Sequence, residues 1–218
     1  DGGPLSGLKV VELGQLIAGP FAGKTLGDFG AQVIKVEPPG TGDPLRQWRV
    51  VQDGTSVWWQ VQSRNKQSVV LDPRTDEGRA DVRRLIDEAD VLIENFKPGT
   101  MKKLGLDYAS LKKLNPRLIY VSHKGFLPGP YEHRTALDEV VQMMGGLAYM
   151  TGRPGDPLRA GSSVNDIMGG LFGAIGALGA LIQRGITGKG MEVQSALFEN
   201  NVFLVGQHMM QYAVTGKP

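Results

Sequence analysis

The first part of the chain alternates short apolar runs with longer amphipathic segments. The apolar runs are bounded by Gly, Pro or polar clusters and predict buried strands over residues 8–13, 32–36, 68–71, 91–94 and 118–122. Between them, the apolar residues and the Gly, Pro and Asp boundaries predict helices over 19–30, 76–89, 98–103 and 107–114. Strands that alternate with helices are typical of a parallel sheet with helices on both faces, so we predict an open α/β fold.

After residue 136 the pattern becomes mainly helical. We predict helices over 136–150, 163–184 and 195–212, with a short strand at 191–193. Residues 167–182 carry no charge and are rich in Gly and Ala. Four of the glycines are spaced so that they share one face, which would let another helix approach closely; they are Gly169, Gly173, Gly176 and Gly179.

Asp166 is the one acidic residue at the start of this uncharged helix. Ser163 precedes it by three positions, which is the spacing of a Ser-x-x-Asp capping pattern. The positive end of the helix dipole favours a charged carboxylate, so we expect Asp166 to be ionised. On these residues alone, a helix cap is the commoner role for such an Asp, and a catalytic carboxylate is the alternative.

The composition limits the classes of function. The 218 residues are 41% hydrophobic and carry a net charge of +2, from 24 basic and 22 acidic residues, which gives no electrostatic case for nucleic acid. The chain has no Cys, and its three histidines are scattered, so we expect no disulfide and no metal site. No basic segment precedes an apolar run at the start, and residues 167–182 are fewer than the about 20 of a membrane span. We expect a soluble cytoplasmic protein that binds no membrane.

Ligands of open α/β sheets bind beyond the carboxyl ends of the strands. The segments there, 14–20, 37–46, 94–99 and 122–129, all contain Gly or Pro. Residues 18–25, AGPFAGKT, resemble a phosphate-binding P-loop. However, Pro20 has no N–H for a phosphate, and no predicted strand ends in the Asp that would hold magnesium. These two departures argue against an NTPase.

Six stretches in order resemble the family III CoA-transferases, the group that includes formyl-CoA transferase and carnitine CoA-transferase. They are LSGLKVVEL, IAGPFAGKTLGDFGAQVIKVEPPGTGDPLR, RNKQSVVLD, ADVLIENFKPGTMKKLGL, NPRLIYVSHKGF and VNDIMGGLFGAIGALGALIQRGITGKG. The resemblance covers residues 5–218 and implies that 1–218 form the N-terminal part of a Rossmann-like CoA-binding large domain. Family members are longer, with a second domain and a return of the chain to the first, and two such chains interlock as a homodimer.

The resemblance places the catalytic nucleophile on Asp166. In that chemistry the carboxylate attacks a thioester, and the CoA thiolate then forms an aspartyl-CoA thioester that an acceptor acid resolves. The implied substrates are an acyl-CoA donor and an organic acid acceptor, for which family habit suggests a dicarboxylate. CoA is therefore a substrate here and not a permanently bound cofactor.

The resemblance also implies a set of contacts to CoA. Residues 16–18 match a segment that touches CoA, 71 and 74 match an adenine-side pair, 95–97 line the pantetheine, and 103 and 134 are basic positions. The set is Leu16, Ile17, Ala18, Leu71, Arg74, Asn95, Phe96, Lys97, Lys103 and Arg134. Some members carry Arg where this chain has Pro38, and Arg46 or Lys66 are the candidates to replace it. For Arg74 and Lys103 an ordinary solvated surface is the alternative.

Two other functions compete with CoA transfer. The alpha-methylacyl-CoA racemases share the fold and use a His and an Asp as paired acid and base. Their Asp falls at Asp166, but their His falls at Leu137, which cannot move a proton, and His133 is four residues away. The non-enzymatic alternative is an inactive fragment for CoA binding or assembly, which would bind CoA without turnover.

Overall fold

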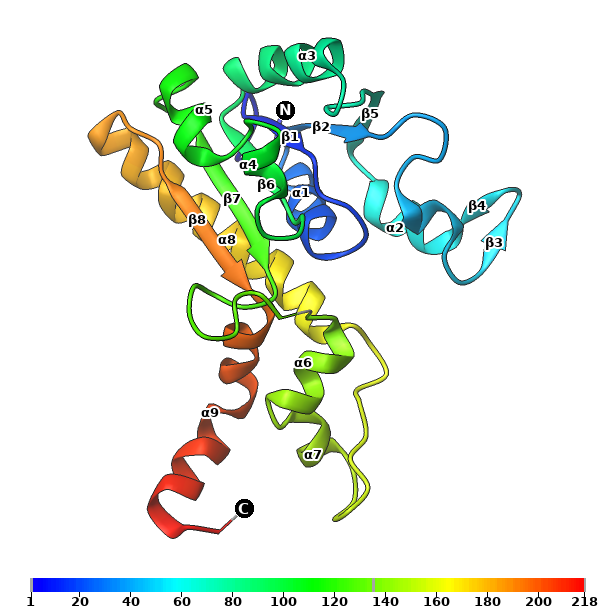
Figure 1. Cartoon of the computed structure of the whole chain (residues 1–218), viewed down its shortest axis with the longest axis vertical. Helices are drawn as coiled ribbons and strands as arrows, with labels where there is room; N and C mark the ends of the chain where they lie inside the picture. Colours follow the sequence, from blue (N-terminus) through cyan, green and yellow to red (C-terminus); the bar gives the residue numbers. More distant parts are fainter. Residues whose placement is uncertain (1, 135, 218) are drawn as a thin grey trace.

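A computed structural model describes residues 2–134 and 136–217, and a parallel sheet forms its centre. Six strands follow one another in the order β5-β2-β1-β6-β7-β8 (Figure 1). Each neighbouring pair runs parallel, as the sequence predicts. The strands are β1 (Lys9–Glu12), β2 (Gln32–Glu37), β5 (Lys66–Val70), β6 (Val91–Glu94), β7 (Ile119–Lys124) and β8 (Glu192–Ala196).

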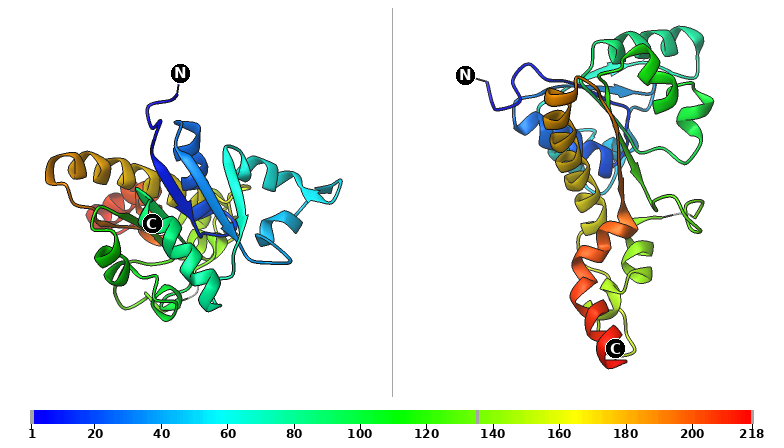
Figure 2. Two further views of the ribbon diagram at one scale, coloured as in Figure 1. Left: turned by 90° about the horizontal axis from the view of Figure 1, so that it is seen from above. Right: turned by 90° about the vertical axis from the view of Figure 1, so that its left-hand side faces the viewer.

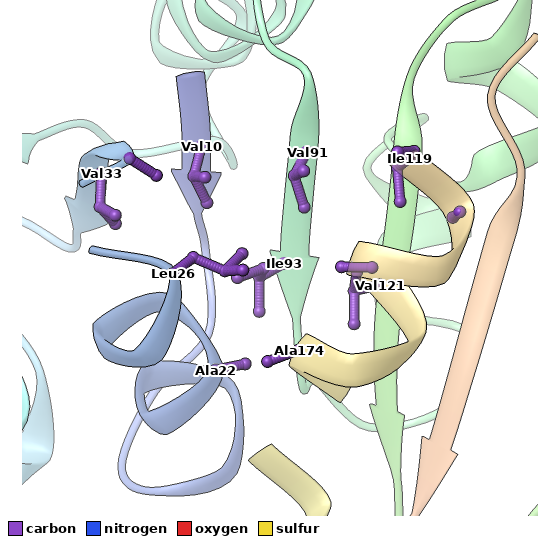
Figure 3. Close-up of a cluster of buried hydrophobic side chains, with 12 residues drawn as sticks. Val10, Ala22, Leu26, Val33, Val91, Ile93, Ile119, Val121 and Ala174 are labelled. Carbon is purple, nitrogen blue, oxygen red and sulfur yellow. The ribbon is translucent and has the colours of Figure 1, made fainter. Parts of the chain in front are cut away.

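Helices cover both faces of the sheet, which confirms the predicted architecture (Figures 1 and 2). One face packs against α1 (Ala18–Asp28) and α8 (Val164–Thr187). The other packs against α3 (Asp76–Asp87), α4 (Thr100–Lys103) and α5 (Tyr108–Leu114). Successive strand residues point to opposite faces, so Ile93 joins the first core and Leu92 the second. Figure 3 shows the first core, where Ala22 of α1 meets Ala174 of α8 below the strands.

Helix α8 is the longest element and lies against α1. A Cβ added at Gly170 would lie 2.7 Å from the Ala18 carbonyl oxygen and 2.7 Å from the Phe21 Cβ. Only a residue without a side chain permits this approach of two helices. The close helix contact predicted from the glycine pattern is therefore real, but Gly170, which lies outside the predicted stripe, makes it.

The stripe itself faces the sheet more than another helix. A Cβ at Gly173 would collide with the His123 ring on β7, and one at Gly176 would lie 2.5 Å from Val193 on β8. Gly179 has open space beside it. The prediction that one face of four glycines receives a helix is wrong, because the inner face of α8 meets α1 at one end and strands further along.

We expect alanine to have opposite effects at two glycines of α8. Gly170→Ala would lower the free energy of unfolding by about 1–3 kcal/mol, because the added methyl group meets backbone that cannot move freely. Gly179→Ala would raise it by about 0.5–1 kcal/mol, because the space is open and Ala favours helix. Urea unfolding of both variants measures the two values. Effects of the same sign would contradict the packing described here.

Among the described residues, α8 is the one helix that is long and apolar enough to cross a membrane, by length and composition alone. It runs for 24 residues, so the expectation that this segment is too short for a span is wrong. In this fold it packs against α1 and the sheet, and its Ala174, Ala177 and Ala180 belong to the core.

The remaining helices extend beyond the sheet. The single helix predicted over 136–150 is two, α6 (Asp138–Met144) and α7 (Leu147–Thr151), because Gly146 has a positive φ of 84° between them. Helix α9 (Leu197–Thr215) runs beside them, away from the sheet (Figure 2). No element was predicted for 48–65, where β3 (Val51–Gln52), β4 (Thr55–Ser56) and α2 (Val57–Ser63) follow the short 3₁₀ helix η1 (Pro44–Gln47).

Candidate active site

Loops at the carboxyl ends of the central strands form a pocket of about 380 Å³. Its lining residues come from the β1–α1 loop and from the segment after β6; they are Gln15, Leu16, Asn95, Phe96, Lys97 and Thr100. Four of them were predicted as CoA contacts, and Gln15 and Thr100 were not. Gln15 precedes the predicted Leu16 and Thr100 follows the predicted Lys97 by three residues, and this nearness in sequence was the one signal that could have indicated them. The pocket lies where open α/β sheets bind ligands.

Asn95 joins the two loops. Its Oδ1 accepts a hydrogen bond of 2.7 Å from the Gln15 backbone N–H, and its Nδ2 donates one of 2.7 Å to the Gln15 carbonyl. The amide is therefore engaged with the backbone of the β1–α1 loop at both ends. In this structure Asn95 shapes the pocket as well as lining it.

Four charged side chains lie buried beneath the β1–α1 loop, and we call them the buried ion cluster. Lys35 Nζ lies 2.9 Å from Glu12 Oε1 and 2.9 Å from Asp43 Oδ2, and Lys66 Nζ lies 2.8 Å from Glu12 Oε2. Burial opposes the ionisation of Glu12, but the two ammonium groups outweigh it and lower its pKa. Burial likewise opposes the charge of Lys35, and the two carboxylates outweigh it and raise its pKa. Two negative and two positive groups balance.

The buried ion cluster holds an unusual backbone conformation at Leu16. Leu16 has a φ of +64°, in the left-handed region that a branched side chain disfavours. Asp43 accepts hydrogen bonds from the Leu16 N–H at 3.1 and 3.2 Å, and Lys35 donates one of 2.7 Å to the Gly14 carbonyl. The cluster therefore fixes the loop that lines the pocket.

Both candidates for the missing Arg at Pro38 are engaged with buried carboxylates. Lys66 has a side chain only 2% exposed within the buried ion cluster. Arg46 donates two hydrogen bonds of 2.7 Å to the Glu37 carboxylate. Burial opposes the charge of Glu37, but these bonds and others lower its pKa to about 2. Each side chain thus serves a buried carboxylate, although Arg46 remains one-third exposed, and a role of either in place of the missing Arg stays a prediction.

The other predicted CoA contacts lie outside this pocket, as far as the described residues show. Ile17 and Ala18 are buried, each only 4% exposed. Leu71 lines a separate groove beneath α3. The remaining three are exposed: Arg74 pairs with Asp72 at 2.8 Å, Lys103 ends α4, and Arg134 lies over the Tyr131 ring at 4.5 Å. Their contact with CoA stays a prediction.

Asp166 lies in the first turn of α8, and a residue from another helix holds that turn. Within the described residues, the Ser163 side chain makes no capping hydrogen bond, so the predicted capping pattern is wrong. Asp138 of α6 takes that place, because its Oδ2 accepts hydrogen bonds from the backbone N–H of Asn165 at 2.7 Å and of Asp166 at 3.1 Å. Sequence reasoning missed Asp138, which is 28 residues away from Asp166.

The carboxyl of Asp166 is harder to ionise than the sequence suggested. Burial and the neighbouring charge of Asp138 raise its pKa to about 7, against a smaller opposite effect of Arg159. A pKa near 7 corrects the expectation of a carboxylate that is fully ionised at neutral pH. A strongly shifted pKa in a carboxyl marks a candidate functional group, and Asp166 lies one turn before Gly170, which packs against Ala18 at the end of the β1–α1 loop.

These features define an α/β domain with a pocket at the carboxyl ends of its strands and a carboxyl of raised pKa at the start of α8. The family follows from direct comparison. The model of CoA-transferase family III matches residues 5–218, so the chain belongs to that family.

Among curated proteins, the chain is 44% identical to a succinyl-CoA–D-citramalate CoA-transferase of Chloroflexus aurantiacus, over 98% of the chain. It is 42% identical to a succinate–glutarate CoA-transferase of Agrobacterium fabrum, over 99% of the chain. It covers 54% and 56% of these proteins, so it spans about half the length of the curated relatives it matches.

Solved structures agree with the fold. A CAIB/BAIF family protein from Brucella suis is 46% identical, with a TM-score of 0.94 over 100% of this chain and 59% of that one. Rv3272 from Mycobacterium tuberculosis is 35% identical, with a TM-score of 0.90 over 99% of this chain and 60% of that one.

Proposed function

We propose that the protein carrying this chain transfers CoA from an acyl-CoA thioester to a carboxylic acid through a thioester on Asp166. The observation that carries the proposal is the position of Asp166, a largely buried carboxyl in the turn of α8 that leads to the packing contact with Ala18, the first residue after the pocket loop. Relatives are named for succinate, glutarate, D-citramalate and oxalate, which supports a dicarboxylic acid as substrate.

In the proposed reaction an Asp166 oxygen attacks the thioester carbonyl and displaces the CoA thiolate, which leaves a mixed anhydride. The thiolate attacks the Asp166 carbonyl, releases the donor acid and forms the aspartyl-CoA thioester. An acceptor carboxylate then displaces the thiolate, and the thiolate attacks the acceptor's acyl carbon, which restores Asp166. No water is consumed, so burial of the site protects both reactive intermediates from hydrolysis.

Asp138 contributes to this chemistry without touching the substrate. Its hydrogen bonds to the start of α8 hold Asp166 in place, and its charge keeps the pKa of Asp166 high. A carboxylate with a raised pKa is a better nucleophile once it is ionised, since its charge is less stabilised by its surroundings.

Trapping of the intermediate over a range of pH tests the proposal. The complete protein is mixed with succinyl-CoA, treated with borohydride and mapped by mass, and we expect modification at Asp166. The initial rate of thioester formation should fall about tenfold per pH unit below pH 7 and level off above it, because the neutral carboxyl cannot attack. Asp138→Asn keeps a hydrogen-bond acceptor but removes the charge that raises the pKa of Asp166. The pH range over which the rate falls should therefore shift to lower pH.

One control variant and two contrary outcomes make the trapping decisive. Asp156→Asn changes an exposed carboxyl in the segment between α7 and α8 and should leave the profile unchanged. A pH-independent rate between 5 and 8 would contradict the role given to Asp166. Proton exchange at the acyl α-carbon without any adduct would favour the racemase alternative instead.

We also propose that the protein works as a homodimer, as the family resemblance implies. Helix α9 extends from the body with exposed apolar side chains, among them Phe203, Met210 and Val214. Two relatives from Chloroflexus aurantiacus are named as alpha and beta subunits of a succinyl-CoA–L-malate CoA-transferase. The cytoplasmic location stays a prediction.

A further inference from the structure

Arg159 lies beside Asp138, the same carboxylate that holds the first turn of α8, and its segment is itself fixed. The next residue, Ala160, donates a backbone hydrogen bond of 2.7 Å to the side chain of Gln142, which is fully buried in α6. Arg159 Nε also donates to the Ala160 carbonyl at 3.2 Å. The start of this arginine side chain is therefore positioned by the core, like the residues of the pocket loop.

The guanidinium of Arg159 is only loosely engaged. Its Nη2 lies 3.7 Å from Asp138 Oδ1, and its Nη1 lies 3.5 Å from Glu139 Oε2. Strong charge-assisted hydrogen bonds are about 2.7–2.9 Å long, so these contacts orient the group without saturating its donors. The side chain is one-third exposed. Its positive charge lowers the pKa of Asp166, against the larger effects of burial and Asp138.

We propose that Arg159 binds the second carboxylate of a dicarboxylic acid whose first carboxylate reacts at Asp166. This inference rests on the proposed function. A planar guanidinium matches a carboxylate with two parallel hydrogen bonds, and its loose contacts leave donors to offer. A monocarboxylic acid of the same length has no second carboxylate to bind the Arg159 guanidinium. Arg159 is thus the residue that selects between the two classes of acid.

The local charges also set when the acid binds. Asp138 and Glu139 are acidic and lie beside Arg159, so a dianion is opposed while Asp166 carries a charge of its own. Conversion of Asp166 to a thioester removes that charge. The acceptor is therefore bound more tightly by the thioester form than by the free protein at a pH above 7, where Asp166 is mostly ionised.

Pairs of acids of equal length test the inference in the complete protein. We expect Arg159→Gln to reduce the preference for succinate over butyrate, and for glutarate over valerate, by about 10–100-fold in kcat/KM. Arg159→Lys should keep part of the preference, because it keeps the charge without the fork. Arg153→Gln changes an exposed arginine after α7 and should leave the preference intact. An equal loss for both acids would overturn the inference and leave Arg159 as a counter-ion of Asp138.

A binding measurement separates this inference from the proposed function. Asp166→Asn is neutral at this position, as the thioester is, so it should bind glutarate more tightly than valerate in calorimetry. Adding Arg159→Gln should remove that difference. Equal binding of the two acids by Asp166→Asn would overturn the inference even if transfer activity is found. A clear difference without any thioester on the unchanged protein would reject the proposed function alone.

Discussion

We expect Asp166→Asn to lower the rate of CoA transfer by at least about 10⁴-fold, because it would remove the proposed nucleophile of both half-reactions. The same change makes the fold more stable above pH 7. The folded state holds a proton on Asp166 up to about pH 7, whereas an unfolded Asp releases it near 3.8. Stability is therefore lost as the pH rises between these values, and Asn removes that loss. Activity that falls while stability rises is the signature of a site built for chemistry.

The measurement pairs initial rates of transfer with urea unfolding at pH 5 and pH 8. Asp156→Asn, at an exposed carboxyl, should change neither. Retention of more than about 1% of the rate by Asp166→Asn would place the nucleophile elsewhere, with the neighbouring Asp138 as the next group to examine.

Lys35→Met is expected to cost about 3–5 kcal/mol of unfolding free energy. It would leave Glu12 and Asp43 buried with Lys66 as the remaining cation of the buried ion cluster. Removing one partner from a buried pair is costly, because the partner's charge stays in a medium that solvates it poorly. CoA binding should weaken as well, since Asp43 holds the Leu16 backbone in the conformation that lines the pocket.

Lys9→Met provides the matched control. Lys9 pairs with Glu88 at 2.9 Å, but the two side chains are 49% and 74% exposed. Exposed pairs contribute about 0–1 kcal/mol, so this variant should unfold close to the unchanged protein. Adding Asp43→Asn to Lys35→Met should recover part of the loss, because it removes one uncompensated charge. Equal losses of unfolding free energy for Lys9→Met and Lys35→Met would show that the buried ion cluster stabilises the fold no more than an exposed ion pair does.

The sheet could be predicted because its evidence is local. Each strand is a short apolar run, and the two faces of the sheet fill from alternate residues of that run. The missed hairpin also had a local signal, because Asp53 and Gly54 both have positive φ, as an Asp-Gly turn requires. The break between α6 and α7 was readable in the same way from Gly145 and Gly146.

The site could be predicted only in part because its evidence is long-range. Asp166 was found through the family resemblance, whereas the Asp138 contact joins helices 28 residues apart. The capping rule for Ser163 failed because a carboxylate from another helix reaches the same N–H groups. Lys66 looked like a free cation in the sequence, since the burial that engages it with Glu12 appears only when β1 and β5 are brought close in the sheet.

Asp138 and Arg159 differ in how freely evolution can alter them. Asp138 serves the start of α8 and the pKa of Asp166 at once, so a substitution there changes helix and nucleophile together. Arg159 has a loosely held, partly exposed head group, with contacts of 3.7 and 3.5 Å to Asp138 and Glu139. If the proposed roles hold, divergence toward new acids within one scaffold can proceed through Arg159 while Asp138 and Asp166 stay unchanged, because chemistry and selectivity are then assigned to separate side chains.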